Sequence, residues 1–177
     1  LPISVVGATG MVGRTFLKVL EEVKLPAESY TLYASKRSAG KKLTLMGKEY
    51  EVKELNENSF DGMDIALFSA GGATSEKFAP IAASKGCLVI DNSSAWRMDP
   101  EVPLVVPEVN PEDIKKHKGI IANPNCSTIQ AMVALRPLQL KYGIKRIVYS
   151  TYQAVSGAGL GGYNDLKNGI NGEPPQK

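Results

Sequence analysis

The first twenty residues constrain the fold most, because they place a strand, a glycine loop and a helix in that order. Residues 3–6 form an apolar β-type run, and residues 12–20 repeat apolar side chains at helical spacing. Between them, Gly7, Gly10 and Gly13 are spaced three residues apart. Glycines here would let the backbone turn tightly, approach a pyrophosphate and pack the helix against the strand. Any tight turn can collect glycines, but this order favours a dinucleotide-binding fold with phosphates at the helix N-terminus.

Strand and helix patterns then alternate as far as residue 122, which is typical of a doubly wound parallel sheet. The expected strands are residues 30–34, 64–68, 87–91 and 119–122, and residues 104–110 are expected to form a strand with a turn. The expected helices are residues 74–85 and 111–116, and a hairpin is expected over residues 43–45 and 50–52. The sequence thus predicts an α/β, Rossmann-like dinucleotide-binding domain over residues 1–125.

Residues 126–177 are expected to begin a second, α+β domain that is truncated in this sequence. A helix follows Cys126, an apolar strand is expected over residues 144–153, and a glycine loop follows at residues 156–159. Residues 160–177 are rich in Gly, Asn and Pro, so no further element is predicted there.

Two cations follow the second expected strand, in the segment 35–40. An NAD enzyme commonly has an acidic residue here to hold the ribose 2′-hydroxyl, whereas this chain has Lys36 and Arg37 between Ser35 and Ser38. The planar donor fork of Arg37 can clamp a 2′-phosphate, so the segment favours NADP. The alternative is a solvated basic loop.

Polar segments also follow two later strands. Loops at the carboxyl ends of parallel strands are where open sheets bind ligands, so residues 69–72 are a second candidate cofactor loop, although a plain turn is about equally consistent with them. Asn92, Ser93 and Ser94 could bond a ligand amide or phosphate. Arg97 could fix an oxyanion, or it could stack with Trp96 at the surface.

Cys126 lies where a loop turns into a helix, since apolar residues recur at helical spacing after it. Asn125 or Ser127 is the candidate cap. The unpaired N–H groups and positive dipole end of such a helix favour the thiolate, which is the attacking form of cysteine. A lone cysteine is more often a buried small residue, but these polar surroundings favour a nucleophile. Cys87, inside an apolar strand, is assigned to the core.

Composition argues against several other classes of protein. The net charge of +3, with charges of both signs interspersed, lacks the basic stripe of a nucleic-acid-binding protein. Two cysteines and one histidine without metal-ligand spacing indicate neither a metal site nor a disulfide scaffold, which suits a reducing cytoplasm. The apolar run at residues 3–6 is too short to span a bilayer. We therefore expect a soluble, cytoplasmic protein with no nucleic-acid or membrane partner, although a start at Leu1 indicates that the true N-terminus could be trimmed.

Six motifs, in order along the whole chain, closely resemble those of the aspartate-β-semialdehyde dehydrogenases. They are residues 7–13 (GATGMVG), 35–40 (SKRSAG), 69–72 (SAGG), 91–97 (DNSSAWR), 123–128 (NPNCST) and 152–159 (YQAVSGAG). The resemblance implies an NADP-dependent, phosphate-requiring oxidation of L-aspartate 4-semialdehyde to 4-aspartyl phosphate, which runs in reverse during the synthesis of lysine, threonine and methionine. It also implies a homodimer or a dimer of dimers, assembled through the second domain.

The resemblance further implies roles for individual residues. Cys126 would be the nucleophile, Gln153 would orient the thiohemiacetal and acyl intermediates, and Asn125 and Arg97 would help to hold substrate and phosphate. The implied cofactor contacts are Gly7, Thr9, Gly10, Met11, Val12, Gly13, Ser35, Arg37, Ser38, Ser69, Ala70, Gly71, Gly72, Asn92, Ser156, Gly157, Ala158 and Gly159.

Two further groups of the family would be needed for turnover. The family takes its general base from a histidine, and the partner of the substrate carboxylate from an arginine, both in a C-terminal half that this sequence lacks. His117, in a charged run, is not assigned the role of the base.

Two alternative functions remain open at this point. The first is a related cysteine enzyme of the N-acetyl-γ-glutamyl-phosphate reductase type, which the contexts of Cys126 and Arg37 disfavour. The second is a non-catalytic NADP-binding module whose cysteine is structural.

Overall fold

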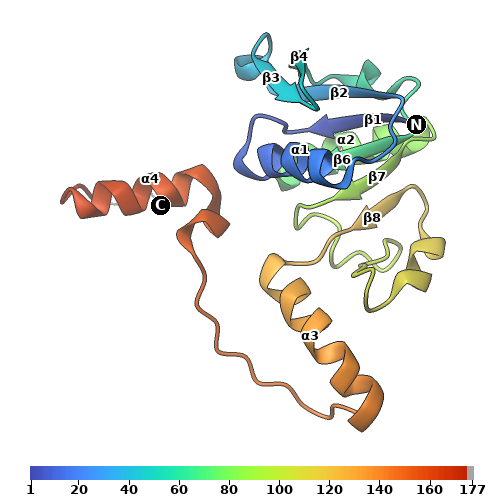
Figure 1. Cartoon of the computed structure of the whole chain (residues 1–177), viewed down its shortest axis with the longest axis vertical. Coiled ribbons are helices and arrows are strands. Elements are labelled where there is room, and N and C mark those ends of the chain that lie inside the picture. Colours follow the sequence, from blue (N-terminus) through green and yellow to red (C-terminus); the bar gives the residue numbers. More distant parts are fainter. Residues whose placement is uncertain (175–177) are drawn as a thin grey trace. The chain divides into compact units, whose positions relative to one another are not determined.

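Six strands form a sheet in which every neighbouring pair is parallel, in the order β5-β2-β1-β6-β7-β8 (Figure 1). The computed structural model describes residues 1–174. The strands of this sheet are β1 (Pro2–Val6), β2 (Ser29–Ala34), β5 (Lys53–Glu54), β6 (Ile65–Phe68), β7 (Leu88–Asp91) and β8 (Ile120–Ala122).

Helices α1 (Met11–Val23) and α2 (Gly72–Ser84) cover opposite faces of this sheet (Figure 1). Successive side chains of a strand point to opposite faces, and β1 uses both. Its Ile3 and Val5 join the core beneath α1, whereas Val6 joins the core beneath α2. The doubly wound, Rossmann-like α/β fold predicted from the sequence is therefore confirmed.

The direction in which the sheet grows changes at β1. From β1 the chain moves outward to β2 and β5, and it then returns to add β6 on the other side of β1. The segments after β1 and β6 lead into α1 and α2, which lie on opposite faces. Such a switch point leaves a crevice at the carboxyl edge of the sheet, where open α/β sheets bind ligands.

Short elements connect the main strands. The predicted hairpin is confirmed as the antiparallel pair β3 (Lys42–Leu45) and β4 (Lys48–Glu51). The predicted helix at residues 111–116 is confirmed as a 3-10 helix. The 3-10 helices of the first 120 residues are η1 (Lys36–Ser38), η2 (Glu57–Phe60) and η3 (Pro111–Lys116).

Of the strand with a turn predicted over residues 104–110, the turn is confirmed, but the strand is reduced to a single bridge. Only Leu104 forms a bridge, to Ala122 of β8, and the amide of Val105 donates to the same residue's carbonyl at 3.1 Å. The chain turns directly afterwards, because the amide of Asn110 donates back to the carbonyl of Val106 at 3.0 Å and Pro107 has no amide hydrogen for a ladder.

The chain divides into two compact units, Leu1–Pro137 and Leu138–Lys177, and each is described by itself. Helix α3 (Cys126–Tyr142) begins in the first unit and ends in the second. The second unit also contains the 3-10 helix η4 (Val155–Ala158) and helix α4 (Gly159–Ile170). The predicted boundary at residue 125, between a dinucleotide-binding domain and a second domain, stays a prediction.

In the second unit one sequence prediction is wrong, and one helix was not predicted. Residues 144–153 are not a strand, and the structure describes no strand between residues 138 and 174 that could pair with them. A strand without a partner leaves its amides and carbonyls without a ladder, so apolar composition alone does not make one. Residues 159–170 form α4, where no element was predicted. Leu160, Tyr163 and Leu166 recur at helical spacing there, but the glycine and asparagine content masked that pattern.

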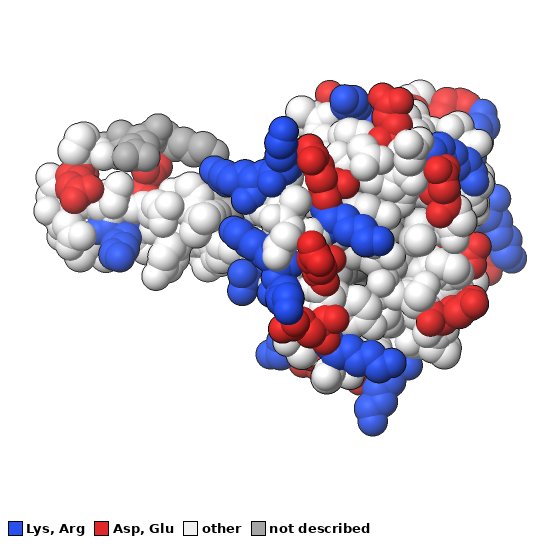
Figure 2. Space-filling view, turned by 90° about the horizontal axis from the view of Figure 1, so that it is seen from above, with Lys and Arg blue, Asp and Glu red and all other residues white. Residues whose placement is uncertain are grey.

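Charges of both signs are interspersed over the face of the larger unit that Figure 2 shows. The larger unit also has exposed ion pairs, including Lys42 with Glu49 at 2.6 Å between nitrogen and oxygen. Such exposed pairs contribute little to stability. Within residues 1–174, no helix combines the length and apolar character needed to cross a membrane.

Gly13 sets how closely α1 approaches the turn that follows β1. A Cβ atom added to Gly13 would lie 2.1 Å from the carbonyl oxygen of Gly7 and 2.8 Å from the Cα atom of Ala8. Both contacts are with backbone, which cannot rotate away. The third glycine of the loop is therefore required for packing the helix against the strand, as the sequence pattern predicted.

We expect Gly13→Ala to lower the free energy of unfolding by about 3 kcal/mol, because the new methyl group must displace the backbone of the β1–α1 turn. Denaturant unfolding followed by circular dichroism measures this. Gly72→Ala is the matched control, since an added Cβ there has no neighbour within 4 Å, and it should leave stability unchanged or slightly higher. Equal stability of Gly13→Ala and the wild type would contradict the packing argument.

Candidate active site

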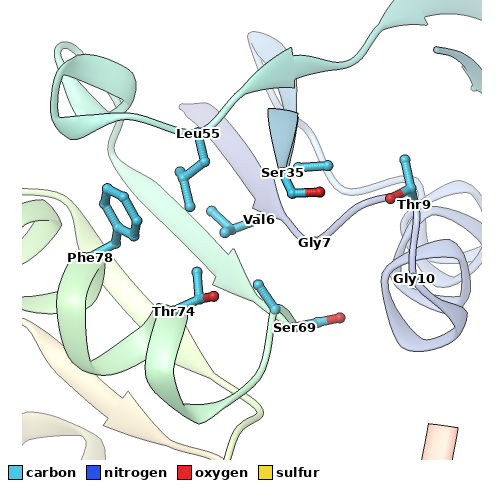
Figure 3. Close-up of a pocket in the computed structure, with 11 residues that line it drawn as sticks. Val6, Gly7, Thr9, Gly10, Ser35, Leu55, Ser69, Thr74 and Phe78 are labelled. Carbon is cyan, nitrogen blue, oxygen red and sulfur yellow. The ribbon is translucent and has the colours of Figure 1, made fainter. Parts of the chain in front are cut away.

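A pocket of about 370 Å³ lies at the carboxyl edge of the sheet, at the switch point between β1 and β6 (Figure 3). The segments after β1, β2 and β6 supply its walls, together with α2. Its lining residues are Val6, Gly7, Thr9, Gly10, Ala34, Ser35, Leu55, Ser69, Ala70, Thr74 and Phe78. Six of these, namely Gly7, Thr9, Gly10, Ser35, Ser69 and Ala70, were predicted as cofactor contacts, so three predicted loops meet in one pocket.

The turn at Gly7 brings the β1 and β6 loops together. Gly7 has φ of +84°, and a Cβ there would lie only 2.6 Å from the carbonyl oxygen of Ser69. The Gly7 amide donates to the carbonyl of Tyr33 at 2.8 Å, which ties the same turn to the end of β2. A positive φ and a close backbone approach both favour glycine, so one residue fixes three strand ends.

Helix α1 begins at this turn without a side-chain cap. Gly10 is the N-cap residue, and no side chain accepts a hydrogen bond there, nor does the first turn contain an acidic residue. The first amides of an α-helix have no partner within the helix, and they favour an anion. Met11 and Val12 form the exposed start of this helix and do not line the pocket, although both were predicted contacts.

The opposite end of the pocket is apolar, and sequence reasoning missed it. Figure 3 shows Leu55 and Phe78 at the end away from Thr9 and Gly10. Leu55 comes from the segment after β5 and Phe78 from α2, and neither was a predicted contact. Thr74, on the first turns of α2, adds a hydroxyl between the two ends. Only the fold, which brings the segment after β5 close to α2, reveals this group.

The basic segment after β2 is placed beside the pocket rather than in its wall. Ser35 lines the pocket, and η1 follows it directly. Arg37 is exposed, whereas Ser38 is buried. The arginine therefore lies two residues beyond a lining residue, with its side chain accessible to solvent.

The loop after β6 combines a tight turn with a buried hydroxyl. Gly71 has φ of +85° and precedes Gly72, where α2 begins. Among residues 1–174, no hydrogen-bond partner meets the buried Ser69 hydroxyl oxygen. Ser69 and Ala70 line the pocket, whereas the two glycines shape the turn beyond it.

A second group of polar residues lies further along the same edge, after β7 and β8. The Nε atom of Arg97 donates to the carbonyl of Asn123 at 3.0 Å, and an Nη atom donates to the carbonyl of Asn92 at 3.2 Å. The Asn123 side-chain amide donates to Asn92 Oδ1 at 2.6 Å. The half-buried arginine thus joins the two strand ends through their backbone carbonyls. Sequence reasoning did not assign Asn123 a role.

Cys126 begins α3, three residues after Asn123, and of the two candidate caps, Asn125 and Ser127, it is Asn125 that caps the helix. The Asn125 Oδ1 atom accepts hydrogen bonds from the amides of Ser127 at 3.0 Å and Thr128 at 3.4 Å. Cys126 is exposed, whereas Cys87 is 1% exposed in the core beside β7. Burial raises the pKa of the Cys87 thiol to about 11. The two thiols therefore differ in access, as the sequence predicted.

Gln153 and the predicted glycine loop at residues 156–159 lie in the second unit, which is described by itself. Within that unit the Gln153 side chain packs on Gly157, where an added Cβ would lie 2.0 Å from Gln153 Nε2. Ser156, Gly157 and Ala158 belong to η4, and Gly159, with φ of +73°, begins α4.

Comparison with known proteins identifies relatives over nearly the whole chain. Residues 2–117 match the family described as semialdehyde dehydrogenase, NAD binding domain. The chain is 70% identical over 169 residues to an aspartate-semialdehyde dehydrogenase of Aquifex aeolicus, covering 94% of this chain and 50% of that protein. It is 56% identical over 159 residues to the Bacillus subtilis enzyme of the same name, covering 90% of this chain and 46% of that protein. The chain thus spans about half the length of the curated relatives it matches.

Solved structures show the same relationship. Aspartate semialdehyde dehydrogenase II of Vibrio cholerae, crystallised in complex with ASA, superposes with a TM-score of 0.92 at 48% identity, over 99% of this chain and 54% of that one. An aspartate semialdehyde dehydrogenase of Candida albicans, crystallised with NADP, superposes with a TM-score of 0.67 at 31% identity, over 81% of this chain and 48% of that one.

Proposed function

The chain belongs to the aspartate-semialdehyde dehydrogenase family, and we propose that it carries the NADP-binding and nucleophile-bearing part of an enzyme that converts L-aspartate 4-semialdehyde and phosphate to 4-aspartyl phosphate. In the cell the reaction would run in the reductive direction, towards lysine, threonine and methionine. The observation that carries the proposal is the position of Cys126, which is exposed and capped by Asn125 at the same sheet edge as the glycine-lined pocket.

The residues that line the pocket at β1 and β6 suit a nicotinamide dinucleotide chemically. Its glycine end offers close backbone approach and uncapped helix amides, which suit a pyrophosphate. Its apolar end, with Leu55 and Phe78, suits an aromatic base. Arg37 would hold the 2′-phosphate that distinguishes NADP from NAD. When bound, the nicotinamide accepts a hydride from the substrate carbon.

Cys126 supplies covalent catalysis in the proposed reaction. Its thiolate adds to the aldehyde carbon, a carbon–sulfur bond forms, and the carbonyl oxygen takes a proton to give a thiohemiacetal. Loss of hydride and of the hydroxyl proton from this adduct gives a thioester on Cys126. A phosphate oxygen then attacks the thioester carbon, and the carbon–sulfur bond breaks to release 4-aspartyl phosphate and the thiolate.

The residues around the nucleophile have distinct proposed tasks. Asn125 caps the helix that presents the thiolate, and with Arg97 it would hold substrate and phosphate. Gln153 would orient the thiohemiacetal and acyl intermediates. In chemical terms, Arg97 suits phosphate because a planar guanidinium offers several donors to one anion.

His117 is not proposed as the general base. It precedes β8, whereas Cys126 follows that strand, so the two residues lie at opposite edges of the sheet. Its Nδ1 atom already accepts a hydrogen bond from the Gly119 amide at 3.0 Å. The base is instead proposed to come from the C-terminal half of the family fold, as are the contacts of a homodimer or a dimer of dimers. A cytoplasmic location is proposed for the whole enzyme.

The cofactor proposal predicts a selective effect of Arg37→Ala. We expect the variant to weaken NADP binding by about tenfold, because a charge-assisted contact with the 2′-phosphate is lost, and to leave NAD binding within about twofold. Calorimetric titration of the chain with each dinucleotide measures both. Lys36→Ala, at the neighbouring position, is the matched control and should change either affinity by about threefold or less. Equal loss for NADP and NAD would contradict the assignment of Arg37.

The nucleophile proposal predicts selective chemical modification of Cys126. Iodoacetamide should label Cys126 rapidly near neutral pH, and aspartate semialdehyde should slow that labelling at least about fivefold by occupying the thiol. Peptide mass spectrometry separates the two cysteines, and Cys87 should stay unlabelled because it is buried and its pKa is raised to about 11.

L-Aspartate, which has no aldehyde, is the control ligand and should protect Cys126 far less. Cys126→Ser should remove native-state labelling entirely. Labelling of Cys126 that is unaffected by the aldehyde would contradict the proposed function.

A further inference from the structure

Asp91 is a buried carboxylate in a row of apolar side chains. At the ends of four adjacent strands, Val6, Phe68, Asp91 and Ala122 are in register, so their side chains lie on the same face of the sheet. Each of the four is 0% exposed. Burying a carboxylate among apolar groups is unfavourable unless hydrogen bonds compensate, so the position calls for a specific partner.

The partner is the hydroxyl of Ser93. It donates to Asp91 Oδ2 at 2.5 Å, and in turn it accepts a hydrogen bond from the amide of Ala95 at 3.1 Å. Ser93 is itself buried. In the described part of the chain, no group donates a hydrogen bond to Asp91 Oδ1. The hydrogen bond that the side chain accepts therefore comes from the turn that contains Ser93. Local bonds of this kind fix the backbone of a turn.

The same turn is held from its other side. The Trp96 indole N–H donates to the hydroxyl of Ser75, a buried residue of α2, at 2.9 Å. Arg97 follows directly and spans the carbonyls of Asn92 and Asn123. The Asp91 carbonyl completes the ring, because it accepts from the Asn123 amide at 2.8 Å. Asp91 thus holds the turn through its side chain and the loop before Cys126 through its backbone.

We propose that Asp91 is a positioning residue which, through Ser93, fixes the turn of residues 92–97 so that the Arg97 guanidinium is held across the ends of β7 and β8. The inference deepens the proposed function, because Arg97 and Cys126 act on substrate only if that function is correct. It explains why a carboxylate lies in an otherwise apolar row. It also adds Asp91 to the residues on which the proposed site depends, although Asp91 would contact neither substrate nor cofactor.

The test measures Arg97 directly and does not depend on turnover. The Arg97 Nε–H signal, assigned by its loss in Arg97→Lys, is followed by nitrogen-edited NMR, and its hydrogen-exchange rate reports how firmly the guanidinium is held. We expect Ser93→Ala to raise that rate at least tenfold and Asp91→Asn to raise it at least threefold. Adding Asp91→Asn to Ser93→Ala should give less than a twofold further increase, because both act through one contact.

Controls separate positioning from general loss of structure. Ser93→Thr keeps the hydroxyl and should restore the wild-type rate, and Ser94→Ala, at an exposed neighbour, should leave it within twofold. Cys87, in the core beside β7, should stay unreactive to iodoacetamide in every variant. An unchanged Arg97 rate in Ser93→Ala and Asp91→Asn would overturn the proposal. Faster exchange accompanied by labelling of Cys87 would overturn it too, since the carboxylate would then serve stability alone.

A further measurement keeps this proposal distinct from the proposed function. Inorganic phosphate should slow iodoacetamide labelling of Cys126 in the wild type, and in Ser93→Ala at least fivefold more phosphate should be needed for the same protection. Absence of phosphate protection in the wild type would count against the proposed function while the Arg97 exchange rates still decide the role of Asp91.

Discussion

The site depends on a close backbone contact between the turn after β1 and the loop after β6. Gly7 lies so near the carbonyl of Ser69 that no side chain fits between them, and Gly13 lies even closer to the carbonyl of Gly7. These two contacts set the distance between the strand ends and the approach of α1. The crevice lies at the switch point of the sheet, and the backbone of Gly7 and Gly10 forms part of its wall. Fold and pocket therefore rest on the same few backbone atoms.

A network of hydrogen bonds, rather than a close backbone contact, positions the nucleophile at the same edge of the sheet. Hydrogen bonds of Arg97 and Asn123 join the ends of β7 and β8, and α3 begins three residues later with Asn125 as its cap. Asp91 anchors the first part of this arrangement in the core. The parallel sheet thus presents a glycine-lined pocket and a cysteine at one edge, which is the combination that a thiol-dependent, dinucleotide-linked oxidation needs.

Sequence reasoning predicted five of the six strands of the sheet, both covering helices and the loops of the pocket, because periodicity and glycine spacing act locally. It missed β5, which has only two residues and so shows no strand pattern. It missed Leu55 and Phe78, since only the fold brings the segment after β5 against α2. It also missed the link from Asp91 to Ser93, which looks like ordinary strand-end polarity in the sequence. The strand expected at residues 144–153 is absent for a physical reason. A strand needs a neighbouring strand to satisfy its amides and carbonyls, and the local sequence pattern does not show whether such a neighbour exists.

Hydrogen–deuterium exchange of the chain with and without NADP tests the central claim most directly, because it reports on all the proposed cofactor loops at once. The account predicts that NADP slows exchange of the backbone amides in residues 7–13, 35–38 and 69–74. Residues 100–118, which include η3 away from this pocket, should exchange at the same rate in both samples. Unchanged exchange in the three loops at saturating NADP, or slowing confined to residues outside them, would contradict it.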